Sequence, residues 1–265
     1  MTADTYSHGH HESVLRSHRW RTAENSAAYL LPHLRPGQSL LDVGCGPGNI
    51  TVDLAARVAP GAVLGIDAAA DAIAAAQEAN SRPDQVTFAV GDVYALDAAD
   101  DTYDVVHAHQ VLQHLSDPVA ALREMRRVTK PGGIVAARDS DYAAFTWAPE
   151  SPLLTRWNEL YHSITTHNRA EANAGRYLLG WAQRAGFTDV TASSSTWTFA
   201  DPETRAWWGG LWADRIQQSS FAEQAVEYGY ADRAELAELA GAWRGWAEQP
   251  DGWFAVLHGE ILAVA

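Results

Sequence analysis

The sequence holds a single cysteine, Cys45, and a single lysine, Lys130, among its 265 residues. One cysteine excludes an intrachain disulfide, so we expect a cytoplasmic protein by default. No apolar run approaches the roughly 18–20 residues that span a bilayer. The first twenty residues also lack the apolar segment of a secretory signal. We therefore expect no membrane partner.

Positive charge is scarce as well, since 19 Lys and Arg face 33 Asp and Glu, for a formal net charge of −14. Phosphate backbones are bound by clustered Lys and Arg and are repelled by net negative charge. We therefore expect no nucleic-acid partner, and a neutral or cationic small ligand is easier to accommodate. Taken alone, the negative net charge also has an ordinary explanation, because net charge keeps a protein soluble.

Short apolar runs alternate with helical patterns in the first half of the chain. The predicted strands are 39–43, 62–67, 86–90, 105–108 and 134–137, with a turn at 130–133 before the last of them. The predicted helices are 10–34, 50–58, 70–79 and 119–128. Strand–helix alternation of this kind predicts an α/β fold with a parallel sheet covered on both faces.

The second half has a different pattern. It predicts helices at 153–167 and 174–185, a strand at 189–199, mostly helix over 202–248 and a closing strand at 252–265. If the last two strands pair, the segment between them is an insertion over one end of the sheet. Ten of the eleven tryptophans lie from Trp147 onward. They indicate either core and lid packing, an aromatic substrate cavity or a dimer interface.

The stretch LLDVGCGPGNIT, from Leu40 to Thr51, places three glycines between a predicted strand and a predicted helix. Glycines at such a turn let a ligand approach bare backbone N–H groups. A Walker phosphate loop would need a lysine directly after Gly48, where Asn49 stands. A dinucleotide fingerprint would need its third glycine one position later. The remaining ligand class is S-adenosylmethionine.

Residues 41–48 resemble the first motif of class I S-adenosylmethionine-dependent methyltransferases. Residues 103–118 (YDVVHAHQVLQHLSDP) are similar to the family's fourth motif, and 126–133 to the turn before its fifth strand. The resemblance covers roughly residues 38–138, is looser to 199 and gives no guidance over 200–248. Within the family the chain is most similar to the small-molecule branch described as ubiquinone/menaquinone-biosynthesis-like.

The resemblance implies a set of donor-binding residues. Asp67, at the end of the second strand, can accept both ribose hydroxyls, as a strand-end carboxylate does beside a glycine turn. Asp92 would face the adenine amino group, and Asp42 would act near the amino-acid moiety. Asn49 could instead cap the helix that it opens. The full set predicted to bind the donor is Tyr6, Asp42, Gly44, Cys45, Gly46, Asn49, Asp67, Ala68, Gly91, Asp92, Val93, His109, Gln110 and His114.

Methyl transfer is an in-line displacement that depends on alignment and desolvation and needs no covalent enzyme intermediate. A weakly acidic nucleophile also needs a base, and His114, just past the fourth strand, is the candidate. Asp139, Asp141 and Tyr142 follow the fifth strand on the expected acceptor side and are the second candidates. Each of these residues also has an ordinary structural explanation as part of a loop.

The N-terminal histidines His8, His10 and His11 invite a metal assignment. A tetrahedral zinc site needs spaced ligands on a rigid frame, often including cysteine, and no such set is evident here. We therefore predict that the protein binds no metal. We interpret the segment instead as a cap over the donor pocket, in which the participating side chains are Tyr6, His18, Trp20 and Arg21. The alternative is a partly ordered terminus followed by an ordinary amphipathic helix.

The sequence thus predicts a Rossmann-like, seven-stranded, mostly parallel sheet with an antiparallel last strand, helices on both faces and a helical lid. The expected organisation is an N-terminal helical cap (1–36), a donor-binding core (37–199), a helical insertion acting as lid or dimer contact (200–250) and a closing strand (251–265). Oligomeric state is left open, with a homodimer among the options.

The predicted activity is methyl transfer from S-adenosylmethionine to a small, aromatic or polycyclic metabolite, on oxygen, nitrogen or carbon. An indole-type ring carbon is one such acceptor, and it would need little help from a base. Two other functions are kept as alternatives. One is a module that binds the donor without transferring its methyl group, and the other is a nicotinamide-dependent oxidoreductase.

Overall fold

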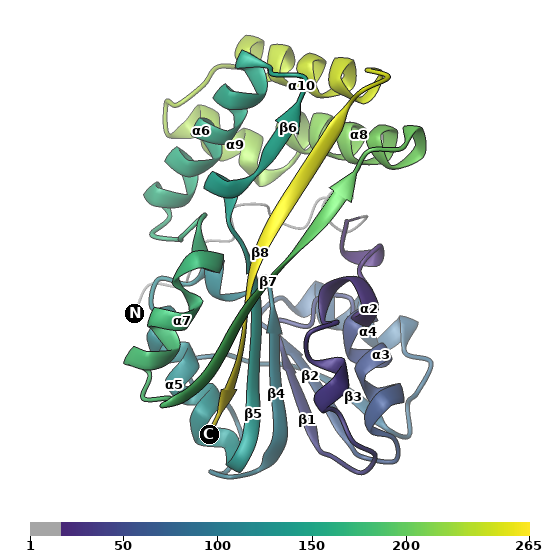
Figure 1. The fold of residues 1–265 in the computed structure, drawn as a ribbon, viewed down its shortest axis with the longest axis vertical. Coiled ribbons are helices and arrows are strands. Elements are labelled where there is room, and N and C mark those ends of the chain that lie inside the picture. Colours follow the sequence, from purple (N-terminus) through teal and green to yellow (C-terminus); the bar gives the residue numbers. More distant parts are fainter. Residues whose placement is uncertain (1–16) are drawn as a thin grey trace.

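The computed structural model describes residues 17–265, which form a sheet flanked by helices and a further helical layer beyond one end of the sheet (Figure 1). The strands are β1 (Leu40–Val43), β2 (Val63–Asp67), β3 (Val86–Val90), β4 (Tyr103–His109), β5 (Thr129–Ser140), β6 (Thr146–Ala148), β7 (Asp189–Phe199) and β8 (Trp253–Val264). The helices beside the sheet are α2 (Ala23–Ser26), α3 (Asn49–Val58), α4 (Ala70–Ala79), α5 (Pro118–Val128) and α7 (Ala174–Arg184).

The further layer contains α6 (Pro152–His167), α8 (Pro202–Gln218), α9 (Ser220–Glu227) and α10 (Arg233–Ala247). Three short 3₁₀ turns, η1 (Leu31–His33), η2 (Leu112–His114) and η3 (Tyr142–Ala144), join these elements. Among the described residues, no helix is long and apolar enough to cross a membrane.

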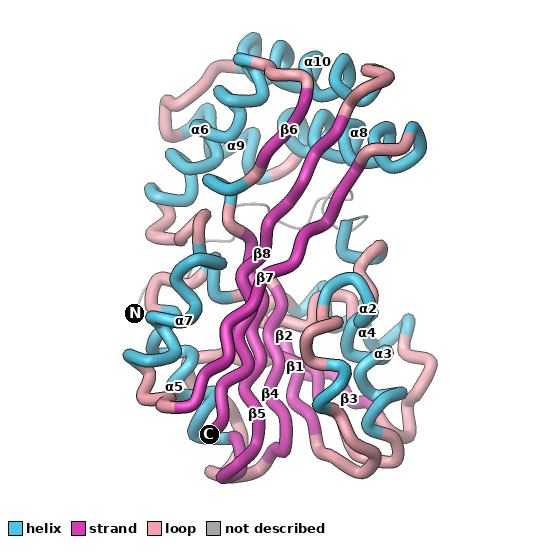
Figure 2. The backbone as a smooth tube through the Cα atoms, in the orientation of Figure 1, coloured by secondary structure: helices cyan, strands magenta, loops and turns pink. Residues whose placement is uncertain are grey.

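The sheet is parallel in its first five strands, in the order β3-β2-β1-β4-β5, and β8 follows antiparallel to β5. One edge of β8 pairs with β7 along its length, while β5 and the short β6 share the other edge (Figure 2). The predicted mostly parallel sheet with an antiparallel last strand is confirmed. The described residues form eight strands rather than the predicted seven. The additional strand, β6, has only three residues, which is too short for a periodic pattern to show in the sequence.

The two faces of the sheet separate neighbouring residues of each strand, because successive side chains point to opposite sides. Leu40 and Val105 pack with α2, α3 and α4. Their neighbours Leu41 and Val106 pack with α5 and α7. Both faces are covered, which explains why these strands are continuous apolar runs in the sequence.

The helical layer has its own aromatic core, in which Trp157, Trp212 and Trp243 are fully buried. Strands β7 and β8 extend out of the parallel part of the sheet into this layer (Figure 1). They pair with each other, so the condition set for the insertion is met, and the segment between them lies over one end of the sheet (Figure 1). Its assignment as a lid or a dimer contact stays a prediction.

Several predicted boundaries were wrong. Within the described residues, the single helix over 10–34 is broken, because Thr22 caps α2 by accepting the N–H of Asn25 at 3.3 Å, and Asn25 accepts the N–H of Thr22 at 2.8 Å. This reciprocal capping box requires extended backbone at Thr22. The prediction that 202–248 is mostly helical is confirmed, and the region divides into three helices, since Ser219 is extended between α8 and α9, and Gly229 (φ 72°) follows α9. The residues 130–133, expected as a turn before the strand, belong to β5, where the pairing with β4 passes from Tyr103–Thr129 directly to Val105–Ile134.

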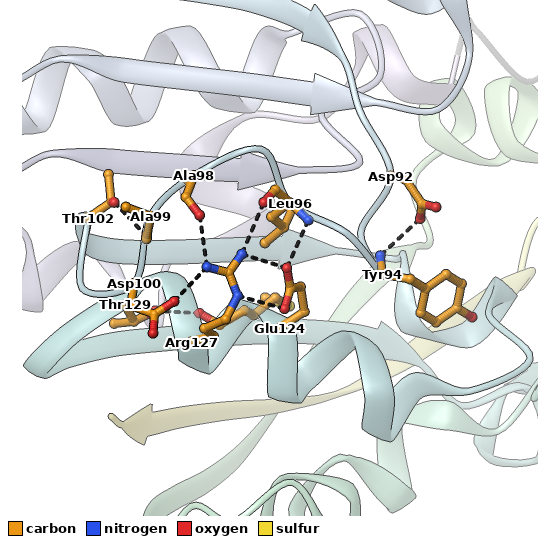
Figure 3. Close-up of polar contacts among 11 residues, drawn as sticks. Asp92, Tyr94, Leu96, Ala98, Ala99, Asp100, Thr102, Glu124, Arg127 and Thr129 are labelled. Carbon is orange, nitrogen blue, oxygen red and sulfur yellow. Dashed lines mark hydrogen bonds and ion pairs between the residues drawn. The ribbon is translucent and has the colours of Figure 1, made fainter.

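The loop after β3 is held to α5 by Arg127 (Figure 3). The guanidinium of Arg127 donates to the carbonyl oxygens of Leu96 (3.0 Å) and Ala98 (2.8 Å) and to both carboxylate oxygens of Glu124. Glu124 in turn accepts the backbone N–H of Leu96 at 3.0 Å. The loop after β3, which contains Asp92, is thus fixed at its far end by a bidentate ion pair on one turn of helix.

We expect Arg127→Ala to lower the free energy of unfolding by about 1 kcal/mol, since the ion pair is partly exposed and solvent screens it. The larger effect is local, because two loop carbonyls lose their donor. Amide hydrogen exchange over residues 93–102 should accelerate more than exchange in β1. Arg123→Ala, one turn earlier in α5, is the matched control. Unchanged loop exchange in Arg127→Ala would show that the ion pair does not hold the loop.

Candidate active site

A cavity of about 870 Å³ opens at the carboxyl ends of the parallel strands. Ligands of open α/β sheets bind at this edge, and ligand pockets commonly measure roughly 300–1,000 Å³. Every residue predicted to bind the donor within 17–265 lines the cavity: Asp42, Gly44, Cys45, Gly46, Asn49, Asp67, Ala68, Gly91, Asp92, Val93, His109, Gln110 and His114. Tyr6 and the histidines His8, His10 and His11 lie outside the described residues.

The three glycines of the turn serve different purposes. All three have positive φ (66° at Gly44, 54° at Gly46 and 83° at Gly48). A Cβ at Gly44 would lie 2.3 Å from Val111, and one at Gly48 would lie 2.6 Å from Phe88. At Gly46 a Cβ would meet only His18 Nδ1, at 3.6 Å. Gly44 and Gly46 both line the cavity, but only Gly46 leaves open space where a side chain would stand, whereas Gly44 and Gly48 allow close packing.

Asp67 ends β2 beside this turn. Its carboxylate accepts the backbone N–H of Gly46 at 3.0 Å and that of Ala69 at 2.9 Å. These bonds orient the carboxylate at the cavity edge and link the glycine turn to the start of α4. The arrangement fits the predicted ribose-binding role, because a carboxylate has about four acceptor positions and can take further donors.

The loop after β3 begins with Gly91, whose N–H donates to the Asp67 carbonyl oxygen at 3.0 Å. Asp92 is exposed, and its Oδ1 accepts the N–H of Tyr94 at 2.9 Å. Gly91 is close-packed, since a Cβ there would lie 3.2 Å from Ile66. The second and third strands thus bring Asp67 and Asp92 to one side of the cavity, as predicted.

Asp42 lies deeper, within β1, and is 2% exposed. Its Oδ2 accepts the Thr51 hydroxyl at 2.5 Å, and its Oδ1 lies 2.7 Å from Nδ1 of His107. Each carboxylate oxygen therefore already has a protein partner, which satisfies an otherwise costly buried acid. Asn49 does not cap α3, because the N-cap position is Gly48.

A hydrogen-bonded network crosses the end of β4. Gln110 has a left-handed backbone (φ 54°), and its amide nitrogen lies 2.8 Å from Ser140 Oγ and 2.9 Å from His258 Nε2. The amide oxygen of Gln110 accepts from Arg21 at 2.6 Å. Burial, followed by the charges of Arg138 and Arg21, lowers the pKa of His258 well below its usual value. The imidazole is therefore neutral, and Nε2 can accept from Gln110.

The other polar residue at this strand end is His109, which is 5% exposed. Its ring lies 5.7 Å from that of Trp197, and among the described residues neither ring nitrogen has a hydrogen-bond partner. Burial, and then the charge of Arg138, lowers the pKa of His109 well below its usual value. His109 thus enters the cavity as a neutral ring.

His114, the candidate base, follows in η2 and lines the cavity. Its Nε2 lies 3.0 Å from the side-chain nitrogen of Gln113. Burial, and then the charges of Arg21 and Arg215, lowers the pKa of His114 to about 3. A group with this pKa is neutral at physiological pH but is a weak proton acceptor, because its conjugate acid forms reluctantly.

Asp139 and Asp141, two of the secondary catalytic candidates, do not line the cavity, whereas Tyr142 does. Asp139 is fully buried, and its Oδ1 accepts the N–H of Gln113 at 3.1 Å. The Asp141 carboxylate pairs with Arg176 at 2.5 and 2.6 Å. The Tyr142 ring stacks on that of Tyr161, 3.8 Å between centroids. The geometry assigns Asp139 to support of η2 rather than to contact with an acceptor.

Burial raises the pKa of Asp139 to about 7, against an ordinary value near 3.8. The native state therefore binds a proton that the unfolded chain releases between about pH 4 and pH 7. The protonated Asp139 carboxyl therefore costs the native state nothing below about pH 4. The free energy of unfolding falls as pH rises from about 4 to 7, because the native state must then give up this proton. Asp139→Asn has no such carboxyl. We therefore expect its free energy of unfolding, relative to that of the wild type, to be more than about 1 kcal/mol higher at pH 8 than at pH 4.5.

Chemical unfolding at the two pH values measures this difference, with Asp189→Asn on the exposed start of β7 as control. A constant difference between wild type and Asp139→Asn across this range would contradict the protonated, buried carboxyl.

Aromatic rings line the part of the cavity beneath the helical layer. Trp20, from the N-terminal segment, packs edge-on against Trp197 (5.1 Å between centroids) and at a tilt against Trp207 (5.2 Å). The indole N–H of Trp197 donates to the Asn25 carbonyl oxygen at 2.6 Å. The aromatic side chains lining this part are Trp20, Tyr142, Phe145, Trp197, Trp207, Trp208 and Trp212. The predicted N-terminal side chains His18, Trp20 and Arg21 all reach the cavity.

Sequence reasoning missed several residues of the site. Ser140 on β5, His258 on β8 and Arg215 on α8 carry no motif, and only the pairing of β5 with β8 places His258 beside Ser140. The concentration of tryptophans was a signal for the aromatic end, but it did not separate lining from core residues. Trp208 lines the cavity, for example, whereas Trp243 lies in the core behind it.

Comparison with known proteins places these features in a family. Residues 34–191 match the family model described as a methyltransferase domain. An uncharacterised methyltransferase of Schizosaccharomyces pombe, C1B3.06c, is 35% identical, and the match covers 97% of this chain and 95% of that protein. The probable methyltransferase ltbC of Aspergillus luteorubrus is 32% identical, with 98% and 97% covered. The chain belongs to the methyltransferase domain family, and it is a S-adenosylmethionine-dependent methyltransferase.

Narrower similarities agree with this membership. The ubiquinone/menaquinone biosynthesis C-methyltransferase of Bdellovibrio bacteriovorus is 38% identical, over 38% of this chain and 43% of that protein. Among solved structures, the YcgJ protein of Bacillus subtilis superposes with a TM-score of 0.58 at 19% identity, covering 89% of this chain and 96% of that one. At this identity the structural match concerns the fold alone. The recognition of the family from residues 41–48 is confirmed.

Proposed function

We propose that the protein transfers the methyl group of S-adenosylmethionine to a small aromatic molecule bound beneath the helical layer. The observation that carries the proposal is the shape of one cavity. It runs from the glycine turn, past His109 at the end of β4, to the tryptophans of β7 and α8. A donor at the glycine turn would leave its reactive end toward the aromatic part.

The donor-binding end fits an adenosyl group on its own geometry. Gly46 offers main chain without a side chain, Asp67 presents an oriented carboxylate, and Asp92 lies at the end of the next strand. When bound, S-adenosylmethionine supplies a methyl group activated by its positively charged sulfur. Placed on these residues, the sulfur would lie toward His109 and Gln110, where the sheet ends.

The protein's own contribution is alignment and exclusion of water. Trp20 and Arg21 close one side of the cavity, and Gln110 fixes Arg21 through a 2.6 Å hydrogen bond. Planar rings provide flat surfaces on which an aromatic acceptor can be oriented. Because His114 is a weak base, this arrangement favours an acceptor whose nucleophile needs little proton removal, such as an electron-rich ring carbon or an already ionised oxygen.

The alternative of a donor-binding module without transfer requires an acceptor side too closed for a second ligand. The cavity extends well beyond the predicted donor residues, and this favours transfer. The nicotinamide alternative is set aside by the family membership.

The test is an assay of small aromatic acceptors with donor carrying a labelled methyl group. We expect label in at least one aromatic product, and loss of that labelling in Trp208→Ala, with binding of S-adenosylhomocysteine retained. Trp253→Ala, a half-exposed tryptophan outside the cavity, is the control. Labelling confined to protein or nucleic acid would contradict a small-molecule acceptor.

A further inference from the structure

A pair of polar side chains lies inside the parallel sheet, on neighbouring strands. In the register of the sheet, Asp42 of β1 stands directly beside His107 of β4. The next residue in this row is Ala136 on β5, and Val105 lies two positions before His107, on the same face of β4. Ala136 and Val105 belong to the apolar core beneath α2, α3 and α4. The pair thus borders an apolar core rather than water.

His107 is fully enclosed, with an exposed fraction of 0%. Its Nδ1 lies 2.7 Å from Oδ1 of Asp42, and among the described residues its Nε2 has no hydrogen-bond partner. Because a carboxylate only accepts hydrogen bonds, we assign the imidazole proton to Nδ1. A buried ring nitrogen without a partner lowers the free energy of unfolding, and an apolar side chain would avoid this cost. Packing of the core alone therefore does not account for a histidine at this position.

The Asp42 carboxylate is held from two separate elements. His107 donates to Oδ1 from β4, and the hydroxyl of Thr51, in the first turn of α3, donates to Oδ2 at 2.5 Å. Donors on both oxygens fix the plane of the carboxylate, as outer hydrogen bonds fix the rotamers of groups in binding sites. A carboxylate has about four acceptor positions, so these two bonds leave room for a further donor.

This carboxylate lies at the glycine-turn end of the cavity, whose lining includes Asp42, Gly44 and Gly46. Of the acids in the described lining, Asp42 is the most buried, whereas Asp67 is half-buried and Asp92 is exposed. S-adenosylmethionine carries an ammonium group on its amino-acid part. A carboxylate that is already oriented and shielded from water attracts an ammonium more strongly than one that rotates freely in solvent.

We propose that His107 is a positioning residue for the methyl donor. It holds the Asp42 carboxylate in the orientation in which that group receives the amino group of S-adenosylmethionine. The inference rests on the proposed function, because it requires the donor at the glycine turn. His107 itself does not line the cavity, so it acts entirely through Asp42. A histidine that only stabilised the fold would not distinguish ligands with an amino group from ligands without one.

The test compares two ligands that differ only beyond the sulfur. S-adenosylhomocysteine has the amino-acid part, whereas methylthioadenosine has the same adenosine and sulfur but ends in a methyl group. Calorimetric titration measures both affinities in the full-length protein and in His107→Leu. We expect the variant to bind S-adenosylhomocysteine about tenfold more weakly, and methylthioadenosine within about twofold of the wild type. Equal losses for the two ligands, or no loss for either, would overturn the inference.

Conservative variants separate positioning from a structural role. His107→Asn places an amide N–H near the position of Nδ1 and should recover much of the affinity for S-adenosylhomocysteine. His107→Gln places its amide near the position of Nε2 and should behave like His107→Leu, so it carries the test if His107→Leu does not fold. Binding by His107→Asn no tighter than by His107→Gln would contradict a role for the bond from Nδ1.

A second donor and a distant residue complete the series. Thr51→Val removes the other hydrogen bond to Asp42 and should show the same selective loss of affinity for S-adenosylhomocysteine. Thr165→Val removes a buried hydroxyl in α6, away from the cavity, and is the control. It should leave both affinities unchanged. A selective loss in Thr165→Val as large as that in His107→Leu would show that the effect does not act through Asp42.

The outcomes separate this inference from the proposed function. If the wild-type protein binds neither ligand at millimolar concentrations, the donor site fails, and the proposed function fails with it. If it binds both and Asp42→Asn leaves the ratio of the two affinities unchanged, the amino group is received elsewhere. In that case the role of His107 is refuted while the donor site stands.

Discussion

Asp67→Ala should weaken the binding of S-adenosylmethionine and S-adenosylhomocysteine at least tenfold, a loss of about 1.4 kcal/mol or more. The variant loses two functions at once. The carboxylate predicted to accept the ribose hydroxyls disappears, and the N–H groups of Gly46 and Ala69 lose the acceptor that orients the glycine turn. Calorimetric titration with S-adenosylhomocysteine measures the effect directly.

Two further variants make this result specific. Asp67→Asn keeps one acceptor oxygen for a backbone N–H and should bind the donor better than Asp67→Ala, though less well than the wild type. Asp71→Ala removes an exposed acid in the first turn of α4 and should bind normally. Unchanged affinity in Asp67→Ala would remove Asp67 from the donor site.

Glu260→Ala should destabilise the protein by about 3–5 kcal/mol, since it leaves a buried charge without its counter-ion. Glu260 on β8 lies 3.1 Å from Nε of Arg138 on β5, and the two side chains are 5% and 1% exposed. Glu260 also accepts the hydroxyls of Ser193 (2.8 Å) and Ser195 (2.5 Å). Burial lowers the pKa of Arg138 to about 10, so its guanidinium is still charged at neutral pH.

Urea unfolding at pH 7 measures this loss, with Glu248→Ala at the exposed end of α10 as control. The double variant Arg138→Met with Glu260→Met should recover much of the stability, because replacing a buried ion pair by apolar groups removes its desolvation cost. A loss below about 1 kcal/mol in Glu260→Ala would indicate that water reaches the pair.

The sequence was sufficient for the parallel core, and particular residues explain why. Leu40–Val43 and Tyr103–His109 are strands whose apolar runs result from burial on both faces, a pattern set by local order along the chain. The glycine turn was also recognisable, but two of its three glycines are needed for packing rather than only for the approach of a ligand. Gly44 and Gly48 are required by Val111 and Phe88, which lie 67 and 40 residues further along the chain, and of the three only Gly46 has no close contact at the place of a Cβ.

The end of the cavity predicted to hold the donor followed from the sequence because the carboxyl ends of parallel strands meet at one edge. Once β1, β2 and β3 were recognised, Asp67 and Asp92 had to lie together. The acceptor end has no such rule. His258 reaches Gln110 only because β8 returns antiparallel beside β5, and a shift of that register by one residue would turn His258 to the other face.

The sequence by itself determined the fold class, the family and the residues that meet at the glycine-turn end of the cavity, because these depend on short-range patterns and on one strand order. Only the tertiary structure decided which side chains line the acceptor part. Trp20, Trp197 and Trp212 come from segments separated by up to 192 residues, and their convergence at one end of a cavity has no linear signature. The burial that makes His114 a poor base and Asp139 a protonated acid likewise depends on packing from several elements.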